Sequence, residues 1–208
     1  MHTGSLNLTV TSPIQTFSEP LTLAEVQVWL GVPVLSPVDA ESDTLISALI
    51  SAAREQAEVL QGRDLIEKQW TLTLETFPPV VELRPPLVSV QSVTYKDSDG
   101  TTHTLAENTD YIVDTSKHPG IIMPPYGESW PSFTGWPTSP ITIAFTSGFA
   151  STAAFWNEAG ARVKLGMKML ISAWFNRRLP FEPSNIGISE MPFTVTALPS
   201  TGSLRVPR

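Results

Sequence analysis

The segment from Ala159 to Arg178 constrains the fold more than any other part of the chain, because it has a clear helical period. Large apolar side chains recur at spacings that place them on one stripe of an α-helix: Val163, Met167, Leu170, Ile171 and Trp174. Burying them is worth roughly 10 kcal/mol before conformational entropy is subtracted, which is comparable to the net stability of a domain. This helix must therefore pack against another apolar surface.

A short helix is predicted near the other end of the chain. Thr22 and Glu25 have the spacing of a capping box, in which each side chain hydrogen-bonds the backbone amide of the other residue. Gly31, followed by Val32-Pro33, ends this helix.

A longer helix is expected from Asp43, as its N-cap, to Gly62. Its apolar positions follow a helical period, and we expect Arg54, Glu55 and Glu58 on its outer face. Since no other segment has a good helical period, we expect the early helices to pack against the late one.

Between the helical segments the period changes to two residues. Trp70, Leu72 and Leu74 alternate with polar residues, which is typical of a half-buried strand. Further strands are predicted at residues 80–83, 88–96, 102–105, 111–114, 120–123 and 141–146. A turn at residues 97–100 joins two of them as a hairpin. Short strands separated by turns predict an antiparallel sandwich or barrel.

The predicted fold class is therefore α+β, a helical bundle of N-terminal and C-terminal helices with an inserted antiparallel β module. The predicted organisation is a flexible N-terminal arm at 1–20, a discontinuous helical core at 21–68 and 155–182, the β module at 69–154, and an extended C-terminal tail at 183–208.

The composition argues against a catalytic or metal centre. The chain has no cysteine and only three histidines, so a thiolate nucleophile and a cysteine or histidine metal centre are excluded, and no cofactor is predicted. His103 or His118 could pair with Asp99 or Asp114, but surface positions at turns are the simpler interpretation. Asp97 and Asp99 could begin a calcium loop, but the terminal glutamate of such a loop is missing. We expect a protein without enzymatic activity.

The charge is divided unevenly along the chain. Residues 1–158 contain 6 Lys/Arg and 18 Asp/Glu, whereas residues 159–208 contain 7 and 2. An acidic body argues against a DNA-binding surface over most of the molecule, because DNA affinity depends on neutralised phosphates. With no apolar run long enough to cross a bilayer and no signal-peptide pattern at the start, we expect a soluble protein made in the cytosol, without a membrane partner.

Aromatic residues are concentrated in the loop 126–136, at Tyr126, Trp130, Phe133 and Trp136. They could cap the core of the β module, contact an adjacent subunit or form a sugar platform. Arg177 and Arg178, at the end of the last helix, could contact a neighbouring subunit or DNA, or complement the helix dipole.

Several segments, taken in order and spacing, resemble one protein family. They are Leu21-Thr22-Leu23-Ala24-Glu25, the helix end at Gly62-Arg63, Leu83-Arg84-Pro85-Pro86-Leu87 with Val90 to Tyr95 after it, Asp110-Tyr111, Trp130-Pro131, Phe145 to Phe149 and the final helix. Together they resemble head-tail connector (adaptor) proteins of long-tailed bacteriophages over residues 20–198.

The resemblance implies a homo-oligomeric, dodecameric ring in the virion neck, made in the host cytoplasm and assembled between the portal protein and a tail-proximal stopper or tail completion protein. It implies that double-stranded DNA passes through the ring channel without sequence-specific binding. A C-terminal extension docks on the portal in this family, and the matching anchors here would be Leu198, Leu204, Arg205 and Arg208. The sequence departs from the expected apolar run at Pro199 to Gly202.

The sequence thus supports a structural adaptor function. The alternative is a monomeric β-rich binding module that uses the aromatic loop 126–136 as its ligand site.

Overall fold

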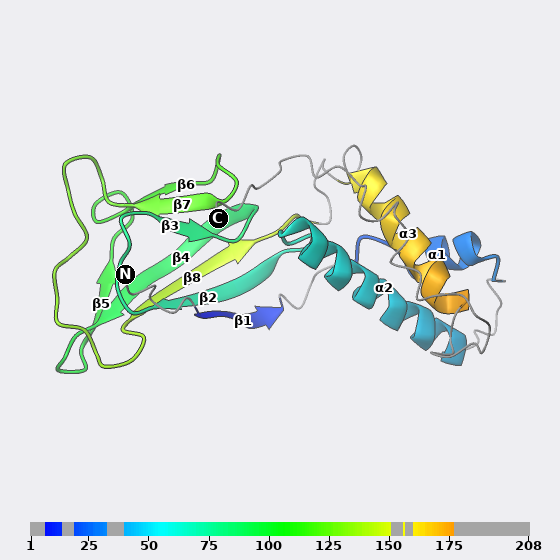
Figure 1. Ribbon diagram of the computed structural model, residues 1–208, viewed down its shortest axis with the longest axis horizontal. Coiled ribbons are helices and arrows are strands. Elements are labelled where there is room, and N and C mark those ends of the chain that lie inside the picture. The colour runs from blue at the N-terminus through cyan, green and yellow to red at the C-terminus, as the bar shows by residue number, and fades with distance from the viewer. Residues whose placement is uncertain (1–6, 14–18, 33–39, 151–155, 157–159, 177–208) are drawn as a thin grey trace, which may run out of the picture. The chain divides into compact units, whose positions relative to one another are not determined.

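The computed structural model describes residues 7–13, 19–32, 40–150, 156 and 160–176. The chain forms two compact units. The sheet unit contains residues 7–13 and 66–150, and the helical unit contains residues 19–32, 40–65, 156 and 160–176. Both helices and antiparallel sheets are present, so the protein is a mixed α+β protein (Figure 1). None of the described helices is long and apolar enough to cross a membrane.

The sheet unit consists of two antiparallel sheets. One has five strands in the order β1-β2-β8-β4-β5, and the other has three in the order β3-β7-β6. The strands are β1 (Asn7–Pro13), β2 (Lys68–Leu74), β3 (Val81–Leu83), β4 (Leu87–Lys96), β5 (Thr102–Leu105), β6 (Ile112–Asp114), β7 (Gly120–Met123) and β8 (Ile141–Ser147). Strands β2 to β8 lie at the segments where the sequence predicted strands.

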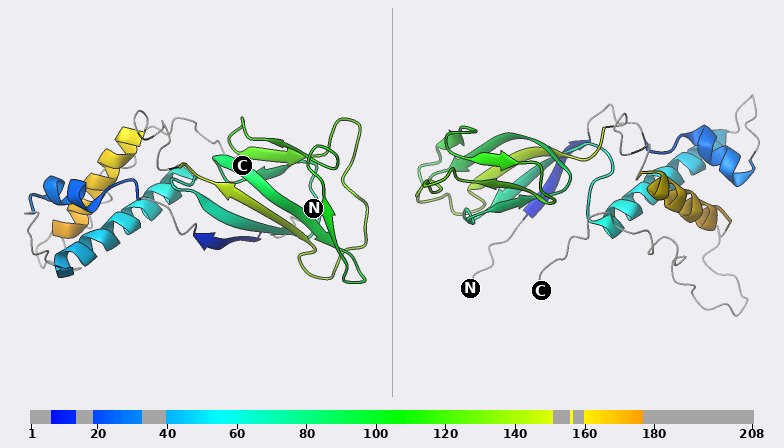
Figure 2. Two further views of the ribbon diagram at one scale, coloured as in Figure 1. Left: turned by 180° about the vertical axis from the view of Figure 1, so that it is seen from behind. Right: turned by 90° about the horizontal axis from the view of Figure 1, so that it is seen from above.

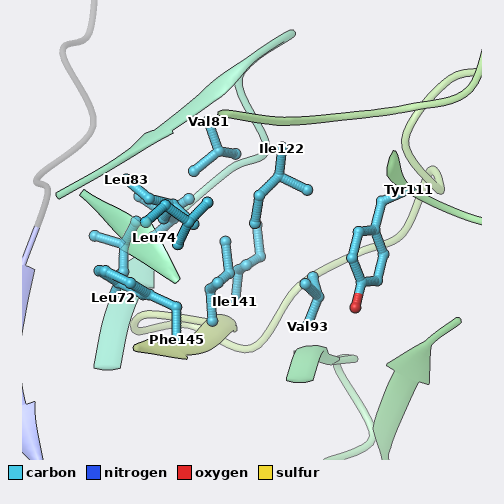
Figure 3. Packing of buried hydrophobic residues seen from close by; sticks show 11 residues of the cluster. Leu72, Leu74, Val81, Leu83, Val93, Tyr111, Ile122, Ile141 and Phe145 are labelled. Atoms are coloured by element: carbon cyan, nitrogen blue, oxygen red, sulfur yellow. The ribbon is translucent and has the colours of Figure 1, made fainter. Parts of the chain in front are cut away.

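The apolar residues of the alternating strands form one core between the two sheets. Leu72 and Leu74 of β2 are buried, and in β8 Ile141, Ile143 and Phe145 are fully buried. Figure 3 shows Leu72, Leu74, Ile141 and Phe145 gathered with the core residues of the other sheet, which are Val81 and Leu83 of β3 and Ile122 of β7. Alternation therefore decides which face of each strand is covered.

Strand β1 lies within residues 1–20, the segment for which the sequence predicted a flexible arm. Residues Asn7–Pro13 form a strand that pairs antiparallel with β2, with a register irregularity between Val10 and Ser12. The sequence Asn7-Leu8-Thr9-Val10-Thr11 alternates polar and apolar residues, which is the two-residue repeat of a strand. The hydrogen bonds that order it come from β2, about 60 residues later in the chain.

Gly148 closes the sheet unit after β8, in a position that accepts no side chain. Its φ is +117°, and a Cβ placed there would lie 2.0 Å from the carbonyl oxygen of Ile66. Its amide donates to the carbonyl of Pro86 over 2.9 Å. The glycine is required here because two backbone segments approach each other at this point.

The helical unit contains α1 (Leu23–Leu30), α2 (Ala40–Gln61) and α3 (Gly160–Asn176). Each of these helices contacts the other two, as the separate views in Figures 1 and 2 also show. Helix α1 begins with the predicted capping box of Thr22 and Glu25, and it ends at Gly31 in the left-handed conformation, as predicted. The three segments with a helical period therefore pack together, although residues 62–159 separate α2 from α3 in the sequence.

Two features of α2 differ from the sequence-based expectation. The helix begins at Ala40, so Asp43 lies in its first turn and is not the N-cap. The Asp43 carboxylate instead accepts a hydrogen bond from the side chain of Gln27 in α1. Arg54 and Glu58, expected on the outer face, are 5% and 3% exposed. Both corrections arise from partners on other segments, which the local sequence pattern does not contain.

Candidate functional site

Two of the aromatic residues in the loop after β7 fold back onto the sheet unit. The Trp130 ring stacks on Phe77 with a centroid distance of 4.4 Å, and its indole nitrogen donates to the carbonyl of Pro78 over 2.8 Å. Phe133 lies 4.4 Å from Tyr95 and meets the edge of Phe77 at 6.2 Å. These contacts extend the core of the sheet unit, which was one of the three interpretations that the sequence left open.

The other two aromatic residues of the loop are more accessible. Trp136 is 39% exposed, its backbone amide donates to the carbonyl of Lys96, and the Lys96 ammonium lies 4.2 Å from its ring centroid. Tyr126 is fully exposed. The structure therefore separates the four predicted contact residues, and Tyr126 is the one whose ring is wholly available to another molecule.

The turn of the β4–β5 hairpin contains Asp97 and Asp99, and His103 follows it on β5; the sequence left open whether these residues form a catalytic or calcium site. Asp97 accepts hydrogen bonds from the amides of Asp99 and Thr101, and its other oxygen lies 2.8 Å from Nε2 of His103. The hydrogen bond to His103, together with those from the two amides, lowers the pKa of the Asp97 carboxyl. The His103 ring also stacks on Tyr95. This is the geometry of a stabilised turn, with the histidine partnered by Asp97 and not by Asp99 or Asp114.

The remaining candidates for a catalytic or metal site are dispersed. His118 is exposed, and the Asp114 carboxylate accepts from the amide and hydroxyl of Ser116, which lower its pKa. Within the described ranges there is no cluster of three or more histidine, aspartate or glutamate side chains that could hold a metal ion.

A polar seam joins α1 to α3 in the helical unit. The Trp29 indole nitrogen donates to the hydroxyl of Ser172 over 2.8 Å, and the Lys168 ammonium lies 6.0 Å from the Trp29 ring. A hydrogen bond from the Thr22 amide, followed by smaller effects that include the charges of Lys164 and Lys168, lowers the pKa of Glu25. The lysines of α3 are thus partly directed at α1.

An ion network links Glu19, which precedes α1, to Arg54 and Glu58 of α2. The Arg54 guanidinium lies 3.0 Å from Glu19 and 3.1 Å from Glu58, and Ser51 donates to the same Glu19 carboxylate. Glu58 also accepts from the amide of Leu65, which follows the helix. Arg54 and Glu58 are buried while Glu19 is half-buried, and their burial is tolerated because each group is hydrogen-bonded.

Large apolar side chains remain on the surface of the helical unit. Val28 on α1 and Val59 on α2 are 73% and 74% exposed, and Leu165 on α3 is 47% exposed. Trp29, Leu45 and Leu60 are also exposed. None of these residues is among the contacts predicted from the sequence. Leu45, Val59 and Leu165 nevertheless fall outside the apolar stripes of their helices, which is a pattern that the sequence shows.

Several predicted contact residues lie outside the described residues. They are Arg177 and Arg178, predicted to contact a neighbouring subunit, and Leu198, Leu204, Arg205 and Arg208, predicted to bind the portal.

No protein-family model and no curated protein matches the chain. Solved structures do match. A chain in the neck of an empty gene transfer agent (GTA) particle with C6 symmetry aligns with a TM-score of 0.70 and 18% identity. Chains in the virion of the native GTA particle and in its neck with C12 symmetry give TM-scores of 0.66 and 0.62, each at 20% identity. All three alignments cover 92% of this chain and 92% of the other chain. The likeness establishes a shared fold.

Proposed function

We propose that this chain is a structural head-tail adaptor subunit of a phage-like virion. It forms a ring in the neck between the portal protein and a tail-proximal stopper or tail completion protein, and it leaves a channel through which double-stranded DNA passes. The observation that carries the proposal is the fold match to chains of GTA neck structures over 92% of both sequences. The symmetric assemblies of those neighbours support a ring, with twelve subunits where C12 symmetry applies.

The acidic charge of the chain supports the proposal that DNA passes through the channel without being bound there. The first 158 residues carry three times as many acidic as basic residues. A wall of that sign repels phosphates, so DNA would move past it without specific binding.

The arrangement proposed for the subunit is a bundle of α1, α2 and α3 with the β module inserted between α2 and α3 in sequence. Mutual contacts among the three helices support it. The rival function, a monomeric module with the aromatic loop as ligand site, is less well supported, because Trp130 and Phe133 are used within the sheet unit.

The test is assembly on portal particles. Full-length protein is mixed with purified portal-containing heads from the same particle and imaged by electron microscopy. The expected result is an added ring of density at the outer end of the portal. Heads that remain unchanged at saturating protein concentration would contradict the adaptor function. An oligosaccharide ligand that bound to the free monomer would favour the rival.

A second arm tests the C-terminal tail. Deleting residues 191–208, which contain the four predicted portal anchors, is expected to leave the thermal midpoint unchanged and to abolish attachment to portal particles. A large fall in the midpoint would show that these residues belong to the folded core, contrary to the prediction.

A further inference from the structure

The outer face of α2 carries an exposed stripe that runs along the helix. Leu45, Ala48, Ala52, Glu55 and Val59 are separated by alternating intervals of three and four residues, which is the spacing of the contact positions in paired helices. All five are exposed, and Val59 is 74% exposed. An aliphatic side chain this accessible, in line with a second one at Leu45, is typical of a contact surface.

The opposite face of α2 is already occupied. Ile46, Ile50, Ala53 and Ala57 are buried, and α2 packs against α1 and α3. The two sets of residues are offset by about half a turn of helix. The stripe from Leu45 to Val59 therefore points away from the neighbours of α2 within the helical unit.

Helix α3 has a corresponding outer face. Arg162 and Leu165 are exposed and Met169 is half-buried, again at intervals of three and four residues, whereas Val163, Met167 and Leu170 are buried. Helices α2 and α3 pack against each other (Figure 2), and the exposed residues of each helix lie outside its buried stripe.

The charges of the two helices are opposite. Helix α2 contains four carboxylates and one arginine, and the arginine is buried, while Glu41 and Glu55 are exposed. Helix α3 contains Arg162, Lys164 and Lys168 and no acidic residue. On the outer faces themselves, Glu55 of α2 and Arg162 of α3 have opposite charges, so two α2 faces would repel each other, whereas an α2 face and an α3 face attract.

From these observations we propose that, in the ring, the outer face of α2 on one copy binds the outer face of α3 on the next copy. The inference rests on the proposed function, since it assigns the contact between ring subunits. A contact between two different faces of the same chain is heterologous, and repeating it around a rotation axis closes a ring. Leu45 and Val59 on one copy and Leu165 and Met169 on the next form its apolar centre, with Glu55 and Arg162 among the charges that set its orientation.

The chain contains no cysteine, so introduced thiols report contacts without background from this protein. The double variant Val59→Cys/Leu165→Cys is assembled on portal particles, treated with a short flexible bis-maleimide, denatured and separated by gel electrophoresis. The expected product is a ladder of covalent dimers, trimers and higher species. Each single-cysteine variant is expected to give monomers, and an equal mixture of the two single variants is expected to stop at dimers.

Three outcomes would overturn the inference. Dimers from Val59→Cys alone would show that two α2 faces meet. Imaged rings without a ladder would exclude the α2–α3 contact and leave the adaptor function intact. A ladder of equal yield from the control pair Val88→Cys/Leu165→Cys, whose Val88 is 45% exposed on β4, would show that the linkage is not specific to α2. If unmodified protein forms no ring on the portal, the adaptor function itself fails and the inference fails with it.

Discussion

The two units differ in how far their aliphatic side chains are exposed. Among the described residues, Val59 is the most exposed aliphatic side chain of the helical unit, at 74%, whereas Val88 is the most exposed one of the sheet unit, at 45%. In the sheet unit, one core joins both sheets, and even Trp130 and Phe133 of the long loop pack back onto it. In the helical unit, charged groups lie inside, at Arg54 and Glu58, while Val28 and Val59 are outside. We propose that this difference makes the helical unit the better suited of the two to binding further copies, because its aliphatic side chains are the more exposed.

The largest effect is expected at the junction that closes the sheet unit. Gly148→Ala would place a Cβ 2.0 Å from the Ile66 carbonyl oxygen at a φ of +117°, so backbone must move. We expect a loss of about 4 kcal/mol or more in the free energy of unfolding, measured by urea denaturation. The control is Gly127→Ala, which also has positive φ but no atom within 4 Å of the added Cβ, at a cost of about 1 kcal/mol. Equal effects would show that φ alone matters.

The next effect tests the buried charges of the helical unit. Arg54→Met removes the group that neutralises Glu58 and Glu19, leaving buried carboxylates without it. We expect a loss of about 3 kcal/mol in the free energy of unfolding. Glu55→Gln is the control, because this carboxylate also lies near Arg54 but is 68% exposed; it should change stability by no more than about 0.5 kcal/mol. A stable Arg54→Met protein would mean that the network is dispensable.

A smaller effect separates the two roles of the aromatic loop. Trp130→Ala removes the stack on Phe77 and the hydrogen bond to Pro78, and should lower the unfolding free energy by about 2 kcal/mol. Tyr126→Ala should leave stability within about 0.5 kcal/mol of wild type, since the ring is fully exposed. If Tyr126 contacts a neighbouring subunit, this variant will show weaker ring assembly on portal particles at unchanged thermal midpoint. Unchanged assembly would remove Tyr126 from the interface.

The smallest effect concerns the β4–β5 hairpin and depends on pH. Because the pKa of Asp97 is lowered in the folded protein, the folded state binds fewer protons than the unfolded state between the two pKa values. The stabilisation is therefore complete above the ordinary aspartate value of 3.8 and is lost as the pH falls through the folded-state pKa. Asp97→Asn should lower the thermal midpoint slightly at neutral pH, and the difference from wild type should vanish in strong acid. A pH-independent difference would rule out the ionised carboxylate as its cause.

The sequence by itself determined the elements whose cause is local. The two-residue period located strands β2 to β8, the helical period located α1, α2 and α3, and Thr22, Glu25 and Gly31 fixed the ends of α1, because caps and periodicity depend on residues within a few positions of one another. The resemblance of several segments, taken in order, also indicated the adaptor family, and the chain shares its fold with GTA neck chains.

Only the tertiary structure decided the partners that come from distant segments. Arg54 forms an ion pair with Glu19, Trp130 stacks on Phe77, and β1 pairs with β2. In each case the two partners are too far apart in the sequence for a local pattern to predict the contact. The exposed stripe on α2 depends on both the sequence and the tertiary structure. Its residues are visible in the sequence, but which face of the helix is covered depends on where α1 and α3 pack, and that is settled by burial across the whole unit.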